Sequence, residues 1–419
     1  MTGIGEKLHA HVAALYPLCR SITGAGLRAT LHEIGTRIPL VLAEVPSGTR
    51  VLDWEVPPEW TVRAAWVEAP GGQRVIDFAC HNLHLVQYST PVDRMVPRAE
   101  LAAHLHSLPE QPTLIPYRTS YYVRDWGFCL AHRERLALTE AAYRVRIDST
   151  LAPGSLSYGE CVLPGDQPEE VLFSAHCCHP SLANDNLAAI AVAVELARRL
   201  AARPRRRFTY RFLFAPGTIG AICWLAANSD AVRRIRYGLV LTCLGDSAAP
   251  SYKQSRRGDA PIDRYAAYVL GGIRIQPFSP TGYDERQFGS PGFDLPIGCL
   301  MRSPGGTFAE YHTSADNPDF VQPDALADSL ALLENIVDLI EHDRCWINTA
   351  PLGEPQLGRR GLYDTAADRL ALLWVLNLSD GRHSLFDIAE RSGRPFTAVV
   401  AAAAALRAAG LLTAGASGA

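Results

Sequence analysis

The chain has 419 residues, of which 48% are hydrophobic and 20% charged, and its 40 Lys and Arg nearly balance 43 Asp and Glu to give a net charge of -3. This length predicts more than one domain, the composition excludes a disordered or fibrous chain, and the charge balance excludes bulk electrostatic binding of nucleic acid. Ten cysteines without a regular short spacing suit a reducing compartment. Neither a signal-peptide pattern nor an apolar run long enough to cross a bilayer is visible, so we expect a cytoplasmic protein that does not bind membranes.

The N-terminal third combines two kinds of pattern. It begins with helical segments at Lys7–Leu18 and Leu27–Ile34, separated by a turn at Ser21–Gly26. Short alternating runs then appear between Pro-Pro and Gly-Gly breakers, which is typical of an antiparallel sheet. The strands expected there are Val51–Val56, Thr61–Val67, Arg74–Phe78, Leu83–Tyr88, Tyr117–Tyr122 and Trp126–Leu130.

From about residue 143, strands and helices alternate along the chain. This alternation predicts an α/β sheet covered by helices on both faces. The expected strands are Tyr143–Ile147, Glu160–Leu163, Val171–His176, Phe208–Ala215 and Leu239–Leu244, and the expected helices are Leu187–Leu200, Ile219–Ala227 and Asp324–Glu341.

The C-terminal segment resembles a winged-helix unit. Its expected helices are Asp364–Leu376, Ser384–Arg391 and Phe396–Ala409, and Leu411-Leu412 after Gly410 indicates a short strand. Arg407 is the only charged residue of the third helix, whereas a helix that reads DNA needs basic and polar side chains. We therefore expect this unit to mediate dimerisation or docking, including homo-oligomer formation, and not to bind nucleic acid.

The densest polar cluster follows the expected strand that ends at His176. Asp185 stands at the start of the next helix, and His312 lies far downstream. The open end of an α/β sheet is a common ligand site, and zinc accepts nitrogen and oxygen ligands of these types. On spacing alone, a structural histidine and a helix-capping aspartate are the commoner explanation of such residues, and the case for zinc is weak.

Five stretches of the chain carry a resemblance to a known group of proteins: Tyr16–Gly24, Pro116–Leu130, His176–Asn186, Ser251–Gly258 and Glu310–Asn317. In these stretches the chain resembles a bacterial aminopeptidase-like family associated with polysaccharide biosynthesis. More broadly, it resembles the zinc-dependent exopeptidases, which include aminopeptidases and glutaminyl cyclases. That wider resemblance is carried by the strand that ends at His176, the turn Ala183–Asp185, the strand Phe208–Ala215 with Pro216–Gly220 after it, and Tyr311–Asp316. The resemblance implies a zinc-exopeptidase-like mixed sheet flanked by helices over 1–49 and 136–348. It also implies an inserted antiparallel β domain over 50–135 and a winged-helix-like domain over 355–415.

The resemblance implies metal ligands at His176, Asp185 and His312, and departures from the pattern lie around them. Cys178 and Thr218 stand where the exopeptidases have carboxylates, and Thr242 stands approximately where they have another. Gly217 stands where they have the general-base glutamate. We therefore expect one zinc ion in preference to two.

The absence of a carboxylate at Gly217 raises the question of where the proton-transfer group lies. Glu310 and Glu285 are the candidates for a relocated catalytic group, and Asp246 for a further metal ligand. Glu310 precedes His312 by two residues, so in extended backbone both side chains point the same way. A solvated surface acid is the alternative for Glu310.

A basic loop supplies candidate substrate contacts. Lys253, Arg256 and Arg257 follow Tyr252, and arginine forks bind carboxylates or phosphates, although a solvated loop has the same pattern. Tyr283 belongs to a second loop, which we expect to line the pocket. Cys177 and Cys178 are interpreted as buried small hydrophobes, since adjacent cysteines rarely share one zinc.

These features together predict a zinc-dependent, aminopeptidase-like hydrolase. Its substrate would be a small or peptide-like amide with an anionic group, in a biosynthetic pathway. Two alternatives stay open because of Gly217: an acyl transferase or cyclase in which a substrate amine replaces water, and a catalytically inactive binding protein.

Overall fold

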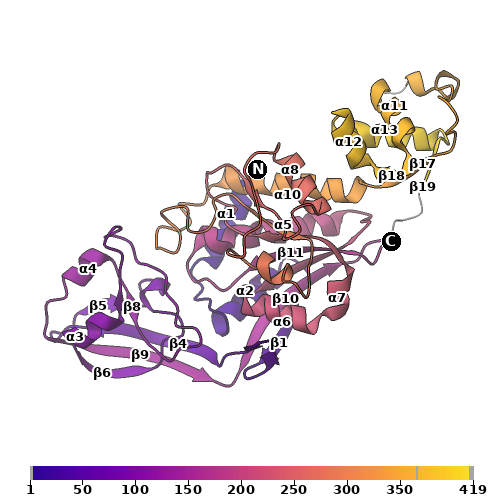
Figure 1. Ribbon diagram of the computed structural model, residues 1–419. Helices are drawn as coiled ribbons and strands as arrows, with labels where there is room; N and C mark the ends of the chain where they lie inside the picture. Colours follow the sequence, from indigo (N-terminus) through magenta and orange to yellow (C-terminus); the bar gives the residue numbers. More distant parts are fainter. Residues whose placement is uncertain (1–2, 365–366, 415–419) are drawn as a thin grey trace. The chain divides into compact units, whose positions relative to one another are not determined.

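The computed structural model describes residues 3–364 and 367–414, and the chain divides into two compact units, Met1–Leu333 and Glu334–Ala419 (Figure 1). The first unit is mixed α/β and contains the large sheet that the strand–helix alternation predicts. The second is a small helical unit with its own sheet. No helix among the described residues has both the length and the apolar character needed to cross a membrane.

The centre of the first unit is an eight-stranded mixed sheet in the order β1-β10-β12-β11-β13-β16-β14-β15. Its four middle strands β12, β11, β13 and β16 run parallel, and β10 and β14 pair antiparallel on either side of them. Every residue of β11 and β12 is buried, in keeping with their mostly apolar sequences, and the two charged residues Glu170 and Arg211 pair with each other at 2.7 Å. The strands are β1 (Val41–Pro46), β10 (Ser155–Leu163), β11 (Glu170–His176), β12 (Thr209–Ala215), β13 (Ile235–Leu241), β14 (Ser251–Lys253), β15 (Ile275–Gln276) and β16 (Ile297–Met301).

Helices accompany this sheet, and their sequences explain their burial. Nine residues of α5 are buried, in keeping with its run of alanine, valine and isoleucine. The helices are α1 (Ile4–Leu15), α2 (Ala25–Gly35), α5 (Ala189–Ala202), α6 (Ile219–Ala227), α7 (Ser229–Arg234), α8 (Pro261–Val269), α9 (Glu285–Phe288) and α10 (Pro323–His342). The α/β prediction for this region is thus confirmed except for the expected strand Tyr143–Ile147, which belongs to the other large sheet. Most of the other expected elements differ from the observed ones by a few residues at their ends.

A second, fully antiparallel sheet in the order β5-β4-β9-β6 forms the inserted region. Its strands are β4 (Glu59–Glu68), β5 (Arg74–Asp77), β6 (Val92–Pro97) and β9 (Ala142–Ala152). β9 lies beyond residue 135, where we expected the insert to end, because its residues 144–152 pair with β4 and its residues 142–147 pair with β6. Two-residue strands and short helices complete the insert: β2 (Arg50–Val51), β3 (Trp54–Glu55), β7 (Leu105–His106), β8 (Phe128–Cys129), α3 (Arg98–Leu101) and α4 (His132–Leu136).

The segment Leu83–Tyr88, expected as a strand, is instead a 3-10 turn (Asn82–His84) followed by extended backbone. Its amides bond to loops, with Val86 N donating to the Gly127 carbonyl and Gln87 N to that of Arg118. Burial, not membership of a regular sheet, therefore explains its apolar residues.

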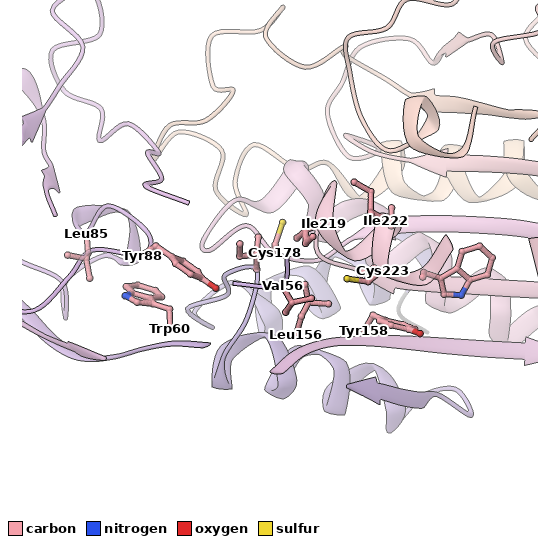
Figure 2. Packing of buried hydrophobic residues seen from close by; sticks show 14 of the residues in the cluster. Val56, Trp60, Leu85, Tyr88, Leu156, Tyr158, Cys178, Ile219, Ile222 and Cys223 are labelled. Atoms are coloured by element: carbon pink, nitrogen blue, oxygen red, sulfur yellow. The ribbon is translucent and has the colours of Figure 1, made fainter. Parts of the chain in front are cut away.

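One hydrophobic cluster joins the insert to the α/β sheet (Figure 2). Trp60 stacks on Tyr88 at 5.8 Å between ring centroids, and the cluster continues through Val56 to Leu156 and Ile219. Cys178 belongs to the same cluster, so the cluster reaches the loop that follows β11. Packing of this kind holds the insert beside the end of the sheet where polar residues gather.

In its described residues, the C-terminal unit has a three-stranded sheet, β18-β17-β19, and the three α-helices α11 to α13. It begins before residue 355, our expected boundary, because the central strand β17 (Cys345–Asn348) pairs with both β18 (Asp380–Ser384) and β19 (Leu412–Ala414). The helices are α11 (Arg369–Leu378), α12 (Leu385–Ser392) and α13 (Phe396–Ala408). Asp368 caps α11, and a capping box of Ser384 and Asp387 begins α12. Residues 365–366 of the first expected helix lie outside the described residues.

Candidate functional site

The polar residues of the predicted cluster meet at the carboxyl end of β11. His176 is the last residue of that strand, Asp185 lies in the irregular turn before α5, and His312 comes from the loop between β16 and α10. Asp316 fixes the turn, because its carboxylate accepts hydrogen bonds from the backbone N–H of Asn184 at 2.6 Å and of Asp185 at 3.0 Å. Elements more than 100 residues apart in sequence thus build one site.

Three histidines surround the fully buried carboxylate of Asp185. The distances are 2.9 Å from His176 Nε2 to Oδ1, 3.1 Å from His312 Nε2 to Oδ2, and 4.0 Å from His179 Nε2 to Oδ2. Although His176 Nε2 and Oδ1 are close, their geometry is not that of a hydrogen bond, and among the described residues both atoms lack a partner. Leaving such buried groups unsatisfied is unfavourable by about 1–3 kcal/mol each. A cation between them would satisfy both, so the residues fit a metal ion.

The electrostatics of the cluster agree with this fit. Burial alone would raise the pKa of Asp185, but the neighbouring charges of His179 and His176 hold it well below its ordinary value. Burial would lower the pKa of His176, and the adjacent Asp185 raises it to about 10. Burial lowers the pKa of the third histidine, His312. A charged carboxylate among imidazoles is a donor set that attracts a divalent cation.

His179 is a member of the cluster that our ligand set omitted. The donor atoms of His179, Asp185 and His312 lie within 4.8 Å of one another, and so do those of His176, Cys178 and His179. The buried side chain of Arg20 positions this loop by donating from Nε to the His179 carbonyl at 2.8 Å. The sequence contained a pattern that could have indicated His179 as a ligand, since it and His176 lie three residues apart on either side of the cysteine pair.

Asp246 is not part of the cluster that Asp185 forms with the three histidines. Its Oδ2 accepts from Asn184 Nδ2 at 2.9 Å, and its Oδ1 accepts from Ser303 Oγ at 2.9 Å and from Ala248 N at 2.9 Å. These bonds occupy the group we considered as a further metal ligand. Asp246 instead ties together the loops that support the turn at Asp185.

Gly217 leaves real space where the exopeptidase pattern has a glutamate. A Cβ added there would lie 3.7 Å from both Cys178 Sγ and His176 Cβ, an ordinary contact distance. The next residue is engaged from another loop, because Thr218 N donates to Asp284 Oδ1 at 2.7 Å. Burial raises the pKa of Asp284 to about 6. A carboxylate that sequence reasoning missed therefore lies beside the gap, one residue from Tyr283.

A cavity of about 570 Å³ opens over the histidines. Asp284 is the only carboxylate among its described lining residues, and Arg286 is the only arginine or lysine. Tyr283 stacks on His176 at 5.4 Å between centroids and an interplanar angle of 17°. The aromatic lining comes from both the insert and the core: Trp54, Tyr117, Tyr121, Tyr122, Tyr283 and Tyr311.

The two glutamates proposed as catalytic groups lie outside this cavity lining. Glu285 is fully buried and pairs with Lys253 at 2.7 Å, beside a second cavity of about 320 Å³. Glu310 is half-buried, and its carbonyl accepts hydrogen bonds from Thr313. Asp284 is better placed than either for proton transfer.

The basic loop also lies apart from the cavity lining. Tyr252 is buried and donates to Asp263 at 2.7 Å, whereas Arg256 and Arg257 pair with Asp294 at 2.8 and 3.3 Å. Of the five expected substrate contacts, Tyr283 alone lines the 570 Å³ cavity, and Lys253 lines only the second one.

Comparison with known proteins gives the family. A model described as a domain of unknown function, DUF4910, matches residues 9–343, and one described as a winged helix-turn-helix matches residues 344–414. The chain belongs to the DUF4910 family. The second match confirms the winged-helix prediction for the C-terminal unit of this DUF4910 protein.

One relative is a Clostridium acetobutylicum protein, named as a proposed polysaccharide biosynthesis protein with an aminopeptidase-like domain. It is 45% identical to this chain over 413 residues, which cover 96% of this chain and 95% of the relative. The crystal structure of a proposed peptidase from Clostridium acetobutylicum is 44% identical, with a TM-score of 0.93 over 98% of this chain and 96% of that one. A Bacillus subtilis zinc aminopeptidase has a TM-score of 0.59 at 13% identity, covering 80% and 94% of the two chains. The aminopeptidase-like fold expected of this DUF4910 protein is therefore confirmed.

Proposed function

We propose that this protein is a zinc-dependent hydrolase that cleaves an amide bond in a small or peptide-like, anionic substrate. The observation that carries the proposal is the buried Asp185 carboxylate, 2.9 and 3.1 Å from His176 and His312, at a cavity of substrate size. The aminopeptidase-like fold and the name of the Clostridium acetobutylicum relative support it. That name also supports a biosynthetic substrate.

In this proposal, Asp185, His176 and His312 hold the zinc ion, with His179 within reach. Bound zinc polarises a carbonyl group and lowers the pKa of a water molecule. Tyr283 stacks against His176 and fixes the plane of its ring. The aromatic lining of the cavity limits the access of bulk water to the bond that is cleaved.

Asp284 is proposed to move the proton from the attacking water to the leaving amine. Its Oδ1 is fixed by Thr218 N, which orients the carboxylate beside the space at Gly217. A carboxyl group with a pKa of about 6 exchanges protons readily near neutral pH. This role replaces those considered for Glu310 and Glu285.

Arg286 is proposed to bind the anionic group of the substrate, in place of Arg256 and Arg257. It lines the cavity, and its buried Nε has no hydrogen-bond partner among the described residues. Its Nη2 lies 3.4 Å from Thr218 Oγ1, so the guanidinium is held close to Asp284 and the gap at Gly217.

Elemental analysis of protein purified without added metal tests the zinc proposal. We expect about one equivalent of zinc or more in the natural chain and none in Asp185→Ala, with both proteins folded by circular dichroism. A natural chain that holds no zinc and takes up none on titration contradicts the proposal.

The space at Gly217 favours a second candidate, an acyl transfer or cyclisation in which a substrate amine attacks in place of water. Reaction in ¹⁸O-labelled water distinguishes the two chemistries. Incorporation of ¹⁸O into the product supports hydrolysis, whereas an unlabelled product supports amine attack. A library of amides that yields no turnover dependent on His176 supports the third reading, a binding protein.

A further inference from the structure

Cys178 occupies a position in the site that the proposed hydrolase leaves unexplained. Its side chain is 3% exposed and lines the 570 Å³ cavity, and its Sγ lies 3.4 Å from His179 Nδ1. Gly217 N donates to the same sulfur at 3.3 Å. The sulfur therefore faces the polar side of its loop, although Cys178 also belongs to the hydrophobic cluster of Figure 2.

The spacing of the donor atoms is that of ligands sharing one ion. Zinc bonds of about 2.3 Å to sulfur and 2.0–2.1 Å to nitrogen put two tetrahedral ligands about 3.5 Å apart. The Sγ–Nδ1 separation of 3.4 Å is close to that value, and His176 brings a third donor within 4.8 Å of the other two.

A second observation is independent of the sulfur. Both ring nitrogens of His176 are buried without a hydrogen-bond partner among the described residues, and the side chain is only 3% exposed. A buried imidazole without a hydrogen bond is rare in proteins, because burial removes the water that would otherwise satisfy it. The contact of Nε2 with Asp185 Oδ1 at 2.9 Å is close but does not have hydrogen-bond geometry. A metal ion bound at either nitrogen would give that nitrogen a partner.

We propose that Cys178 binds a divalent metal ion as a thiolate, together with His176 and His179. This inference rests on the proposed function in one respect, that the centre binds metal. In forming the metal–sulfur bond the thiol gives its proton to solvent, and no electron is transferred. Sulfur and imidazole donors thereby take the place of the carboxylates that are absent at Cys178 and Thr218.

Cobalt(II) tests the assignment without any substrate. The protein is freed of metal, loaded with Co²⁺ and measured by absorption spectroscopy, where a thiolate ligand gives an intense near-ultraviolet charge-transfer band. We expect this band in the natural chain and in Cys177→Ser, and its loss in Cys178→Ser. Cys177 is the matched control because it is adjacent and equally buried, at 2% exposed.

The outcomes separate this inference from the proposed function. Bound Co²⁺ with visible ligand-field bands but without the thiolate band overturns the role of Cys178 and leaves the zinc proposal standing. Failure to bind Co²⁺ or Zn²⁺ at all overturns both.

Protection of the natural chain from alkylation keeps the inference testable if Cys178→Ser does not fold. Zinc should slow the reaction of Cys178 with iodoacetamide by about tenfold or more, as read by peptide mass spectrometry, because a bound thiolate is not free to react. The exposed Cys80 should react equally with and without zinc. Equal reaction of Cys178 in both conditions overturns the proposal.

Discussion

The cluster around Asp185 and the loop Tyr252–Gly258 both have the residue types of a binding site, yet they differ in how far their side chains are already bonded within the protein. Around Asp185, donors from separate elements converge, and the buried nitrogens of His176 lack hydrogen-bond partners among the described residues. In the loop, each of the side chains we selected has a partner: Tyr252 bonds to Asp263, Lys253 to Glu285, and both arginines to Asp294.

This contrast shows why residue type alone does not define a site. A charged or polar group that already bonds within the protein has little to gain from a ligand, because the ligand must replace that bond. A buried group without a partner has the full benefit of a new bond to gain. Substitutions in the two regions test this distinction between groups whose bonding is complete and groups whose bonding is not.

The largest effect is expected for Lys253→Met. The Lys253–Glu285 pair is 7% and 0% exposed, so the substitution leaves a buried carboxylate unpaired, and its Oε2 already lacks a partner among the described residues. We expect the free energy of unfolding, from urea denaturation, to fall by about 3–5 kcal/mol. The double variant Lys253→Met/Glu285→Met should regain most of this loss. A single variant within about 1 kcal/mol of the natural chain would show that the pair is not structural.

Metal removal should produce the next largest change in stability. We expect that change to depend on the Asp185 cluster and not on the basic loop. Chelation should lower the stability of the zinc-loaded protein, since binding at 100 times the dissociation constant adds about 2.7 kcal/mol. Asp185→Asn should not respond to zinc or chelator in thermal denaturation. Asp294→Asn, which disturbs only the basic loop, should respond like the natural chain, and an equal loss of response in both variants would contradict the distinction.

The sequence predicted the α/β core because mostly apolar strand-like segments such as β11 and β12 alternate with helical segments such as α5. It also predicted that His176, Asp185 and His312 meet, through the resemblance to exopeptidases and not through spacing. Leu83–Tyr88 was misjudged because burial outside a sheet gives the same apolar pattern as a strand. Asp284 could not be selected from the sequence as a catalytic candidate. Its suitability for proton transfer depends on its contact with Thr218 N and on its burial, and a local sequence pattern contains neither.

Anion binding should depend on the arginine whose bonding is incomplete. Arg286→Gln should weaken the binding of glutarate, a small dicarboxylate, by about tenfold or more in calorimetry, because a hydrogen bond to a charged group contributes about 1.5–3 kcal/mol. Arg256→Gln is the matched control, since Arg256 already pairs with Asp294. If Arg256→Gln is the variant that weakens binding, the basic loop is the anion site after all.

The smallest effect is expected for Arg256→Ala and Arg257→Ala. Their side chains are 42% and 45% exposed, and the Asp294 side chain that pairs with both is 41% exposed, so solvent screens these ion pairs. Exposed pairs of this kind contribute about 0–1 kcal/mol, and salt reduces the contribution further. Each variant should therefore unfold in urea within about 1 kcal/mol of the natural chain and bind zinc in the same amount. Because Arg257 Nη2 also donates to the Asp294 carbonyl at 2.6 Å, Arg257→Ala should be the more destabilising of the two. A reduced zinc content in either variant would mean that the loop supports the metal centre, and the contrast between the two regions would not hold.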